Sequence, residues 1–274
     1  MQIVTSPSEL QALRREWKGT VGFVPTMGAL HKGHLTLIQK SKAQNEKSIV
    51  SIFVNPTQFG ENEDFAHYPR KPEADANICQ KAGVDILFMP KAEDIYFEED
   101  EVLLKAPQKS GFVLEGAARP GHFDGVLRVV LKLLHLTSPT RAYFGQKDTQ
   151  QLLLIQKMAR ELFLPYEIVP CPTERDSDGL ALSSRNAYLS EAEKKEALKI
   201  SASLKEATKH IMTGELQSSQ IKERALKVLE GVEVEYFEIV DRNLMPLERI
   251  IKGETIILVT ARVGKVRLLD NLWI

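Results

Sequence analysis

The sequence predicts an α/β fold in which a doubly wound parallel sheet is followed by a smaller α+β domain. Up to residue 169, short apolar runs rich in β-branched residues alternate with segments of helical period, the pattern of parallel strands joined by crossover helices. This alternation stops at Pro170-Cys171-Pro172. We therefore expect a Rossmann-like domain over residues 1–174 and an α+β domain over residues 175–274, with a hinge-like loop at the start of the second.

The composition is that of an ordinary globular protein. Hydrophobic residues make up 43% of the 274 residues and charged residues 27%, and the net charge of −1 offers no bulk attraction to nucleic acid or to an anionic membrane. Cys79 and Cys171 are too few for a disulfide framework, and the N-terminus lacks the pattern of a signal peptide. No apolar run approaches the ~18 residues of a membrane-spanning helix. We expect a cytoplasmic protein whose partners are neither nucleic acid nor membrane.

Five strands and five helices are expected in the first domain. The first helix has the clearest start, because Ser6 precedes Pro7 and Glu9 stands three residues after Ser6, as in a capping box. The expected strands cover residues 20–25, 48–54, 84–89, 141–144 and 166–169. The expected helices cover residues 6–18, 33–45, 72–82, 126–136 and 149–162.

The second domain is expected to contain two helices and three strands. Ser190 and Glu193 form a second capping box, which opens a Lys-rich amphipathic helix that ends near Met212. A further helix covers about residues 217–230. Apolar runs then predict strands, with a hairpin between the last two, at residues 232–240, 255–263 and 266–269.

The stretch Phe23–Gln39 carries the strongest functional signal. A buried-type strand leads into a Gly-bearing loop, and His31 and His34 stand where a helix begins. Free backbone N–H groups and the helix dipole make such a junction an anion site. The two imidazoles can donate hydrogen bonds to phosphate oxygens as charge develops on them, and Gly33 lets the backbone approach a ligand closely. The pattern predicts a nucleotide-phosphate site of the H-x-G-H kind.

Two other interpretations of His31 and His34 stay open at this point. Histidines three residues apart could bind zinc, although no Asp, Glu or Cys has the companion spacing, or they could be unrelated surface residues. The sequence contains neither a Walker A loop nor a G-x-G-x-x-G fingerprint. The more common nucleotide motifs therefore do not compete with H-x-G-H.

Amide side chains follow the expected strand at residues 48–54. Asn55 and Gln58 lie just past its C-terminal end, which is the edge where open α/β sheets bind ligands. An amide offers both donors and acceptors, so it can bind a hydroxyl or a carboxylate. For Asn55 turn formation is an equal alternative, because Asn-Pro commonly begins a turn.

Cationic residues stand at two further element boundaries. Arg119 and His122 precede an apolar helix, where they could bind an anion, or Arg119 could pair with a structural carboxylate. Lys147 comes just after the strand expected at residues 141–144 and is best explained as a cation that faces phosphate. Its neighbour Asp148 could simply cap the next helix.

A loop rich in hydroxyl groups begins the second domain. Ser183, Ser184 and Arg185 offer two hydroxyl donors and a fork of N–H donors, which suits a mobile clamp on a triphosphate. The alternative is a solvated Ser-rich linker. An acidic run at residues 98–101 is most simply explained as a solvated loop.

Five sequence blocks, in their order along the chain, resemble the pantothenate synthetases (pantoate–β-alanine ligases), a family of the nucleotidyltransferase superfamily. The blocks read PTMGALHKGH, FVNPTQF, RPGHFDGV, FGQKDTQQL and DGLALSSRN. They span most of the first domain and the loop that begins the second. The NPTQF and SSRN blocks make the resemblance specific to this family, because H-x-G-H alone is shared with other nucleotidyltransferases and class I aminoacyl-tRNA synthetases.

The resemblance implies an ATP-dependent ligase. The carboxylate of pantoate would attack the α-phosphate of MgATP to give pantoyl adenylate and pyrophosphate, and the amine of β-alanine would then give pantothenate and AMP. The second domain would act as a lid that excludes water from the acyl adenylate. Mg²⁺ would enter with ATP, and the sequence identifies no protein ligands for it. The resemblance also implies a homodimer formed through the first domain.

The resemblance further implies roles for individual residues. The phosphates of ATP would be contacted by His31, His34, Lys147, Ser183, Ser184 and Arg185. Pantoate would be held by Met27, Gln58 and Gln151. The ATP site would also include Pro25, Thr26, Gly28, Gly145 and Asp148, the last accepting hydrogen bonds from ribose hydroxyls. Gln146 stands where many relatives carry Glu, so no charge is expected there.

Two other classes of function remain as alternatives. The chain could be a different H-x-G-H nucleotidyltransferase that leaves the nucleotide on its product, or a non-catalytic regulator that binds a nucleotide. A regulator is expected to have lost some catalytic side chains, whereas His31, His34, Lys147 and the Ser-Ser-Arg run are all present. The near-neutral charge disfavours a tRNA-binding relative.

Overall fold

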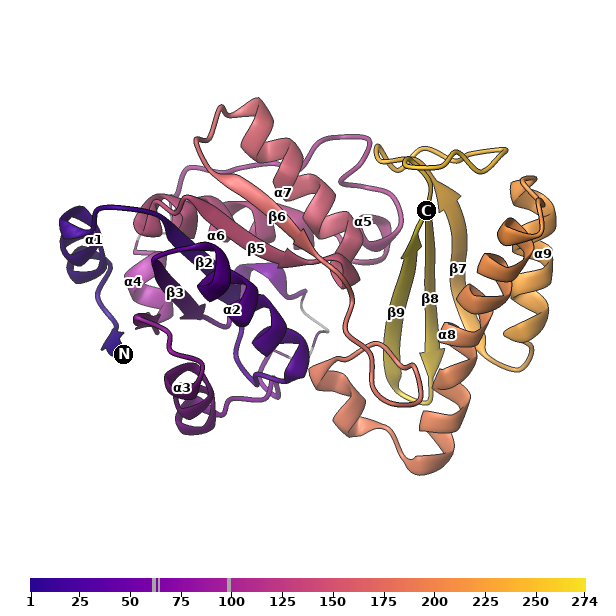
Figure 1. The fold of residues 1–274 in the computed structure, drawn as a ribbon, viewed down its shortest axis with the longest axis horizontal. Coiled ribbons are helices and arrows are strands. Elements are labelled where there is room, and N and C mark those ends of the chain that lie inside the picture. The colour runs from indigo at the N-terminus through magenta and orange to yellow at the C-terminus, as the bar shows by residue number, and fades with distance from the viewer. Residues whose placement is uncertain (61–62, 64, 98–99) are drawn as a thin grey trace. The chain divides into compact units, whose positions relative to one another are not determined.

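A computed structural model describes the chain except for residues 61–62, 64 and 98–99 (Figure 1). The chain divides into two compact units. The first consists of Met1–Gly145 and Gln150–Cys171, and the second of Gln146–Thr149 and Pro172–Ile274. Residues 146–149 thus group with the C-terminal part of the chain, although residues of the first unit flank them on both sides.

The first unit is built on a six-stranded parallel sheet in the order β1-β4-β3-β2-β5-β6. Starting from β2, the chain adds β3 and β4 on one side and later β5 and β6 on the other. The direction of winding therefore changes between β2 and β5, which confirms the doubly wound arrangement. The strands are β1 Gln2–Val4, β2 Val21–Thr26, β3 Lys47–Ile52, β4 Ile86–Phe88, β5 Arg141–Gly145 and β6 Glu167–Cys171.

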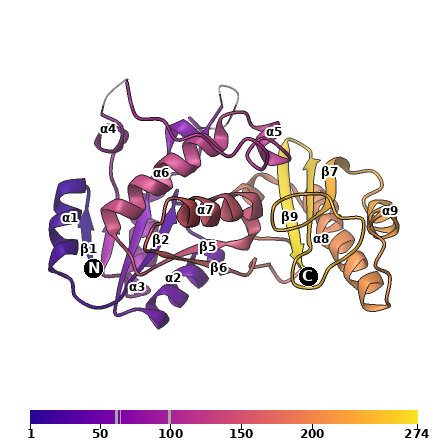
Figure 2. The ribbon, with the colours of Figure 1, turned by 90° about the horizontal axis from the view of Figure 1, so that it is seen from above.

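Helices cover both faces of this sheet: Figure 2 shows α1, α6 and α7 on one side and α2 and α3 on the other. Val24, Val50 and Leu87 pack with Ile38 of α2 and Cys79 of α3. Because both faces are covered, the strands read as continuous apolar runs rather than as alternating ones. The elements are α1 Pro7–Glu16, α2 Lys32–Gln44, η1 Pro56–Gln58, α3 Pro72–Lys81, α4 Ala92–Ile95, α5 Glu115–Ala118, α6 His122–Thr137, η2 Gln146–Asp148 and α7 Thr149–Glu161, where η denotes a 3₁₀ helix.

Two features of the first unit differ from expectation. Strand β1 was not predicted, because it has only three residues, lies at the sheet edge beside β4 and leaves Ile3 exposed. Within the acidic run at residues 98–101, Glu101 is not simply solvated. Glu98 and Glu99 lie outside the described residues, but the carboxylate of Glu101 lies 3.4 Å from the guanidinium of Arg128 and 3.3 Å from the ammonium of Lys132.

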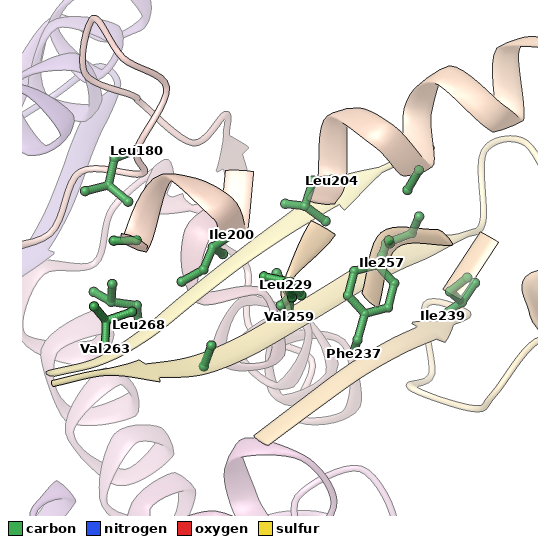
Figure 3. Packing of buried hydrophobic residues seen from close by; sticks show 14 of the residues in the cluster. Leu180, Ile200, Leu204, Leu229, Phe237, Ile239, Ile257, Val259, Val263 and Leu268 are labelled. Carbon is green, nitrogen blue, oxygen red and sulfur yellow. The ribbon is translucent and has the colours of Figure 1, made fainter. Parts of the chain in front are cut away.

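The second unit pairs two helices with a three-stranded antiparallel sheet in the order β7-β8-β9, which confirms the smaller α+β part. Figure 3 shows its core, in which Ile200 and Leu204 of α8 lie with Phe237, Ile257 and Val259 of the sheet. Strand β9 runs four residues beyond the expected end at 269. The elements are η3 Ser184–Tyr188, α8 Glu191–Met212, α9 Ser218–Val228, β7 Glu233–Val240, β8 Ile256–Val263 and β9 Val266–Trp273.

Helices begin at both predicted N-caps, and the second of them, at Ser190 and Glu193, is a reciprocal capping box. Ser6 is the N-cap of α1, where its hydroxyl accepts from the backbone N–H of Glu9. Ser190 is the N-cap of α8, and its backbone N–H donates to the Glu193 carboxylate at 2.8 Å. Within the described part of the chain, no helix is long and apolar enough to cross a membrane.

Candidate active site

The two histidines of the H-x-G-H motif cap the helix that they introduce. His31 is the N-cap of α2, in an extended conformation, and its Nδ1 accepts a hydrogen bond from the Gly33 backbone N–H at 3.1 Å. The His31 backbone N–H in turn donates to Nδ1 of His34 at 3.3 Å. The two ring centroids lie 4.1 Å apart. The imidazoles therefore perform the reciprocal capping that Ser and Glu perform elsewhere.

This capping fixes the tautomer of both rings. Because Nδ1 of each imidazole accepts a backbone hydrogen bond, the neutral ring carries its proton on Nε2. Each Nε2–H is then a donor at the N-terminus of α2, where the helix dipole favours negative charge. The arrangement suits the stabilisation of charge on phosphate oxygens.

The loop between β2 and α2 is held by a buried carboxylate. Asp75, on the first turn of α3, accepts hydrogen bonds from the backbone N–H groups of Ala29 and Leu30, both at 2.8 Å. Its exposed fraction is 2%. Gly28 has φ +85°, and a Cβ there would come within 3.0 Å of Asp75 Oδ2. The positive φ of Gly28 and the two hydrogen bonds to Asp75 thus determine the conformation of this loop.

Sequence reasoning missed Asp75, because an acidic residue in the first turn of a helix is normally explained by the helix dipole. One signal could have found it: Asp75 lies four residues before Cys79, so the two share the apolar face of α3. Burial, together with the nearby Asp75 charge, raises the pKa of the Cys79 thiol to about 12.

The structure brings Met27 and Gln58 together. The Gln58 side-chain amide donates to Met27 Sδ at 2.9 Å, and its Oε1 accepts from the Asn55 side chain at 3.1 Å. Asn55 is 1% exposed, caps the short helix η1 and accepts from the Tyr96 hydroxyl at 2.8 Å. The turn interpretation of Asn55 is therefore confirmed, and its side chain also holds the Gln58 carboxamide.

Arg119 pairs with a carboxylate, which confirms the alternative interpretation of this residue. Its guanidinium binds Glu63 through two hydrogen bonds, of 2.6 and 2.5 Å, and donates to His122 Nε2 at 2.9 Å. Nδ1 of His122 must then carry the proton that it donates to the Gln58 carbonyl at 2.7 Å. Burial and the Arg119 charge lower the pKa of His122 to about 4.

Lys147 and Asp148 lie on η2, directly after β5 ends at Gly145. The Lys147 ammonium and the Asp148 carboxylate are 3.4 Å apart. Gln151 follows in the first turn of α7. The segment 146–149 belongs to the second unit, where the Asn271 side chain of β9 donates to the backbone carbonyls of Gln146 and Lys147.

Ser183, Ser184 and Arg185 stand at the start of the 3₁₀ helix η3, not in an irregular linker. Ser183 is its N-cap, and the Ser183 hydroxyl accepts from the Arg185 backbone N–H at 3.3 Å. Asn186 anchors the helix by donating to the Ala181 carbonyl at 3.0 Å. The solvated-linker alternative is therefore wrong for this segment, whose backbone is held by local hydrogen bonds from the Ser183 hydroxyl and the Asn186 side chain.

The predicted residues thus fall into two groups. The first unit carries Met27 and Gln58, which are in contact, and the two histidines at the start of α2; Pro25 and Thr26 are the last residues of β2. The second unit carries Lys147 and Asp148 on one segment and the Ser-Ser-Arg run on another. Within the described residues, no group of three or more His, Cys, Asp or Glu side chains is arranged to hold a metal ion.

A doubly wound sheet whose central strand leads through a loop to a histidine-capped helix N-terminus is typical of α/β enzymes of the nucleotidyltransferase type. A family model described as pantoate–β-alanine ligase matches residues 2–273, and the chain belongs to that family. Over the full length of both chains, it is 99% identical to a pantothenate synthetase of Wolinella succinogenes. The same comparison with a pantothenate synthetase of Helicobacter pylori gives 52% identity.

Solved structures agree with this assignment. A crystal structure of pantothenate synthetase from Thermus thermophilus has a TM-score of 0.93 and 42% identity, covering 99% of each chain. A pantoate–β-alanine ligase from Francisella tularensis, described as complexed with β-γ ATP and β-alanine, has a TM-score of 0.81 and 36% identity. It covers 100% of this chain and 97% of its own.

Proposed function

We propose that this protein condenses pantoate with β-alanine to form pantothenate, using ATP and releasing pyrophosphate and AMP. The paired imidazoles at the N-terminus of α2 are the observation that carries the proposal, because they form a preorganised donor pair for phosphate. Membership of the pantoate–β-alanine ligase family and the 99% identity with a named pantothenate synthetase support it.

The reaction proceeds in two displacements. A carboxylate oxygen of pantoate attacks the α-phosphorus of ATP, pyrophosphate leaves with the electrons of the broken P–O bond, and pantoyl adenylate forms. The β-alanine amine then attacks the acyl carbon, AMP leaves, and the amine loses a proton. Both steps require mainly positioning and charge stabilisation, which His31 and His34 supply through their Nε2–H groups.

The remaining ATP contacts come from residues at the ends of elements. Lys147 neutralises phosphate charge, while Ser183, Ser184 and Arg185 donate hydrogen bonds to the triphosphate. Asp148 accepts from the ribose hydroxyls. The adenosine and α-phosphate are lined by Pro25, Thr26, Gly28 and Gly145. Support comes from the location of these residues at the end of a strand or the start of a helix, except for Gly28, which lies in the loop between β2 and α2.

Pantoate is held by Met27, Gln58 and Gln151. The contact between Gln58 and Met27, and the bond from Asn55 that fixes the Gln58 carboxamide, support this assignment. Since Oε1 of Gln58 accepts from Asn55, its amino group is the end that can donate to a pantoate oxygen.

Mg²⁺ enters as part of the MgATP substrate and is bound mainly through phosphate oxygens and water. We also propose a homodimer formed through the first unit. Its support is the exposure of three large apolar side chains: Phe97 is 76% exposed, Val102 93% and Leu103 65%. Cys79 and Cys171 carry free, buried thiols, which is compatible with the reducing cytoplasm. Light scattering of the wild type and of Leu103→Glu would test the dimer.

The function is tested by measuring pyrophosphate release from MgATP with and without pantoate, and AMP with and without β-alanine. We expect steady AMP formation only when both acids are present. Pyrophosphate release that is indifferent to pantoate would instead indicate another nucleotidyltransferase. No release by a folded protein that still binds ATP would indicate a non-catalytic regulator.

A further inference from the structure

Two neighbouring residues of β9, Asp270 and Asn271, each bind a segment that carries proposed ATP ligands. Successive side chains of a strand point to opposite faces, so one residue pair can serve two separate segments. Both side chains are buried, with exposed fractions of 3% and 5%. Buried polar groups in a strand are costly unless they are fully hydrogen-bonded, so their partners indicate why polar residues stand here.

Asn271 binds the backbone on both sides of Lys147. Its side-chain amino group donates to the carbonyl oxygens of Gln146 and Lys147, both at 2.9 Å. These carbonyls belong to the peptide groups before and after the Lys147 Cα atom, so the two bonds fix the direction in which that side chain leaves the backbone. The Trp273 indole donates to Asn271 Oδ1 at 3.1 Å and to the Thr149 hydroxyl at 3.3 Å, which anchors the end of the same segment.

Asp270 binds the loop that leads to the Ser-Ser-Arg run. Its two carboxylate oxygens accept hydrogen bonds from the Arg175 guanidinium, at 2.5 and 2.8 Å, and Arg175 also donates to the Gly179 carbonyl at 3.0 Å. Arg175 pairs with Ala181 across an antiparallel bridge. The Leu182 backbone N–H donates to the Glu174 carbonyl at 2.9 Å. The loop is thus closed immediately before Ser183.

We propose that Asp270 and Asn271 are positioning residues, through which β9 sets both Lys147 and the Ser183–Arg185 run for the same triphosphate. This inference rests on the proposed function, since it assigns no new ligand. It explains why residues 146–149 group with the second unit: β9 holds them there. Neither residue touches substrate in this proposal.

The test uses Asn271→Asp in the full-length protein. The substitution keeps the size of the side chain and the acceptor for Trp273, but it replaces the two donated bonds with a carboxylate facing two carbonyl oxygens. We expect pantoate-dependent pyrophosphate release to fall about 10- to 100-fold, the order of loss for a misplaced catalytic group. Asn243→Asp is the matched control, because Asn243 is an exposed asparagine of the same unit.

A second readout does not depend on activity. Hydrogen exchange of the peptide covering residues 142–152 should become faster in Asn271→Asp and stay at the wild-type rate in Asn243→Asp. Thermal unfolding is measured first, and Asn271→Ala replaces Asn271→Asp if the latter is unfolded at the assay temperature. Unchanged exchange together with an unchanged rate would overturn the proposal.

A double-mutant cycle separates positioning from a general structural role. In a Lys147→Ala background, Asn271→Asp should lower the rate less than threefold, because Asn271 acts through Lys147. A full additional 10- to 100-fold loss would overturn the proposal for Asn271. Asp270→Asn should likewise lower the rate less in an Arg185→Ala background than in the wild type, and an equal loss in both backgrounds would overturn the proposal for Asp270. If the wild type itself shows no pantoate-dependent pyrophosphate release, the proposed function fails, while the exchange experiment still decides whether β9 holds residues 146–149.

Discussion

The backbone N–H of His31 donates a hydrogen bond to Nδ1 of His34, so the side chain of one proposed catalytic residue caps the backbone of the other at the start of α2. His31 Nδ1 completes the cap by accepting from Gly33. The two imidazoles are therefore structural and chemical groups at once. Replacing either with Ala removes a cap and a proposed phosphate donor together, and variants have to be chosen that separate the two.

His34→Glu should separate them. Glu at the third helical position can accept the His31 backbone N–H as in a capping box, but a carboxylate cannot donate to phosphate and repels it. We expect adenylation to fall at least 10²- to 10³-fold, with a change in the free energy of unfolding below about 1 kcal/mol. His34→Gln, whose amide retains a donor, should lose less activity. A loss below threefold in folded His34→Glu, measured as pyrophosphate release, would contradict the role of His34.

Lys147→Ala should lower the rate of adenylation about 10²- to 10³-fold, the scale of losing one preorganised charge-stabilising group. The stability should change little, because the Lys147 side chain makes an ion pair only with its neighbour Asp148 among the contacts described. The comparison is Lys157→Ala, which removes a lysine from α7 that pairs with Glu161 at 3.3 Å. Both variants are assayed for pantoate-dependent pyrophosphate release; equal rates would show that Lys147 has no special part.

Asp75→Asn should disturb the loop that precedes His31. An amide has one acceptor where the carboxylate has two, so its amino group would face the backbone N–H of Ala29 or Leu30. We expect the free energy of unfolding to fall by about 1–3 kcal/mol and adenylation to slow as well. Urea denaturation measures the first effect. Glu73→Gln, an exposed acid on the same turn of α3, should leave both quantities unchanged.

His122 predicts a dependence of stability on pH. Its pKa in the folded protein is about 4, below the ordinary value of 6.5, so between these values the unfolded chain binds a proton that the folded protein does not. The contribution of His122 to the free energy of unfolding is therefore fully present above pH 6.5 and is lost as the pH falls towards 4. At 1.36 kcal/mol per pKa unit, the loss amounts to about 3 kcal/mol.

Urea denaturation at pH 7 and pH 4.5 measures this loss. His122→Gln removes the titrating group, so its stability should fall less over that interval than the wild-type stability does. His67→Gln removes an exposed histidine and should keep the wild-type dependence. Identical pH dependence in the wild type and in His122→Gln would show that other groups are responsible.

The sequence was sufficient for most of the architecture, because strands such as β2 and β3 are buried on both faces and read as apolar runs. The sequence pattern does not predict strand β1, since a three-residue edge strand with an exposed Ile3 leaves no periodic signal. The sequence pattern does not predict the end of β9 either, for a related reason. Asp270 and Asn271 interrupt its apolar pattern, and they are polar because they bind other segments.

For the site, local patterns predicted the junction of strand, loop and helix at His31 and His34 but not what surrounds it. The position of Arg119 favoured an anion, with a structural carboxylate as the alternative, and the sequence around Arg119 does not reveal its pairing with Glu63, 56 residues earlier. Asp75 lies 45 residues or more from the N–H groups that it binds. Such choices depend on contacts distant in sequence, which residue spacing alone does not encode.

The polypeptide passes between the two units at residues 145/146, 149/150 and 171/172, not once. A fragment ending at Cys171 would contain Lys147 without the strand that binds its backbone. A fragment beginning at Pro172 would contain Asn271 without the two backbone carbonyls to which it donates. The two halves are consequently not interchangeable modules. Recombination between relatives, or the grafting of a foreign C-terminal half, would have to preserve the hydrogen bonds between residues 146–149 and β9.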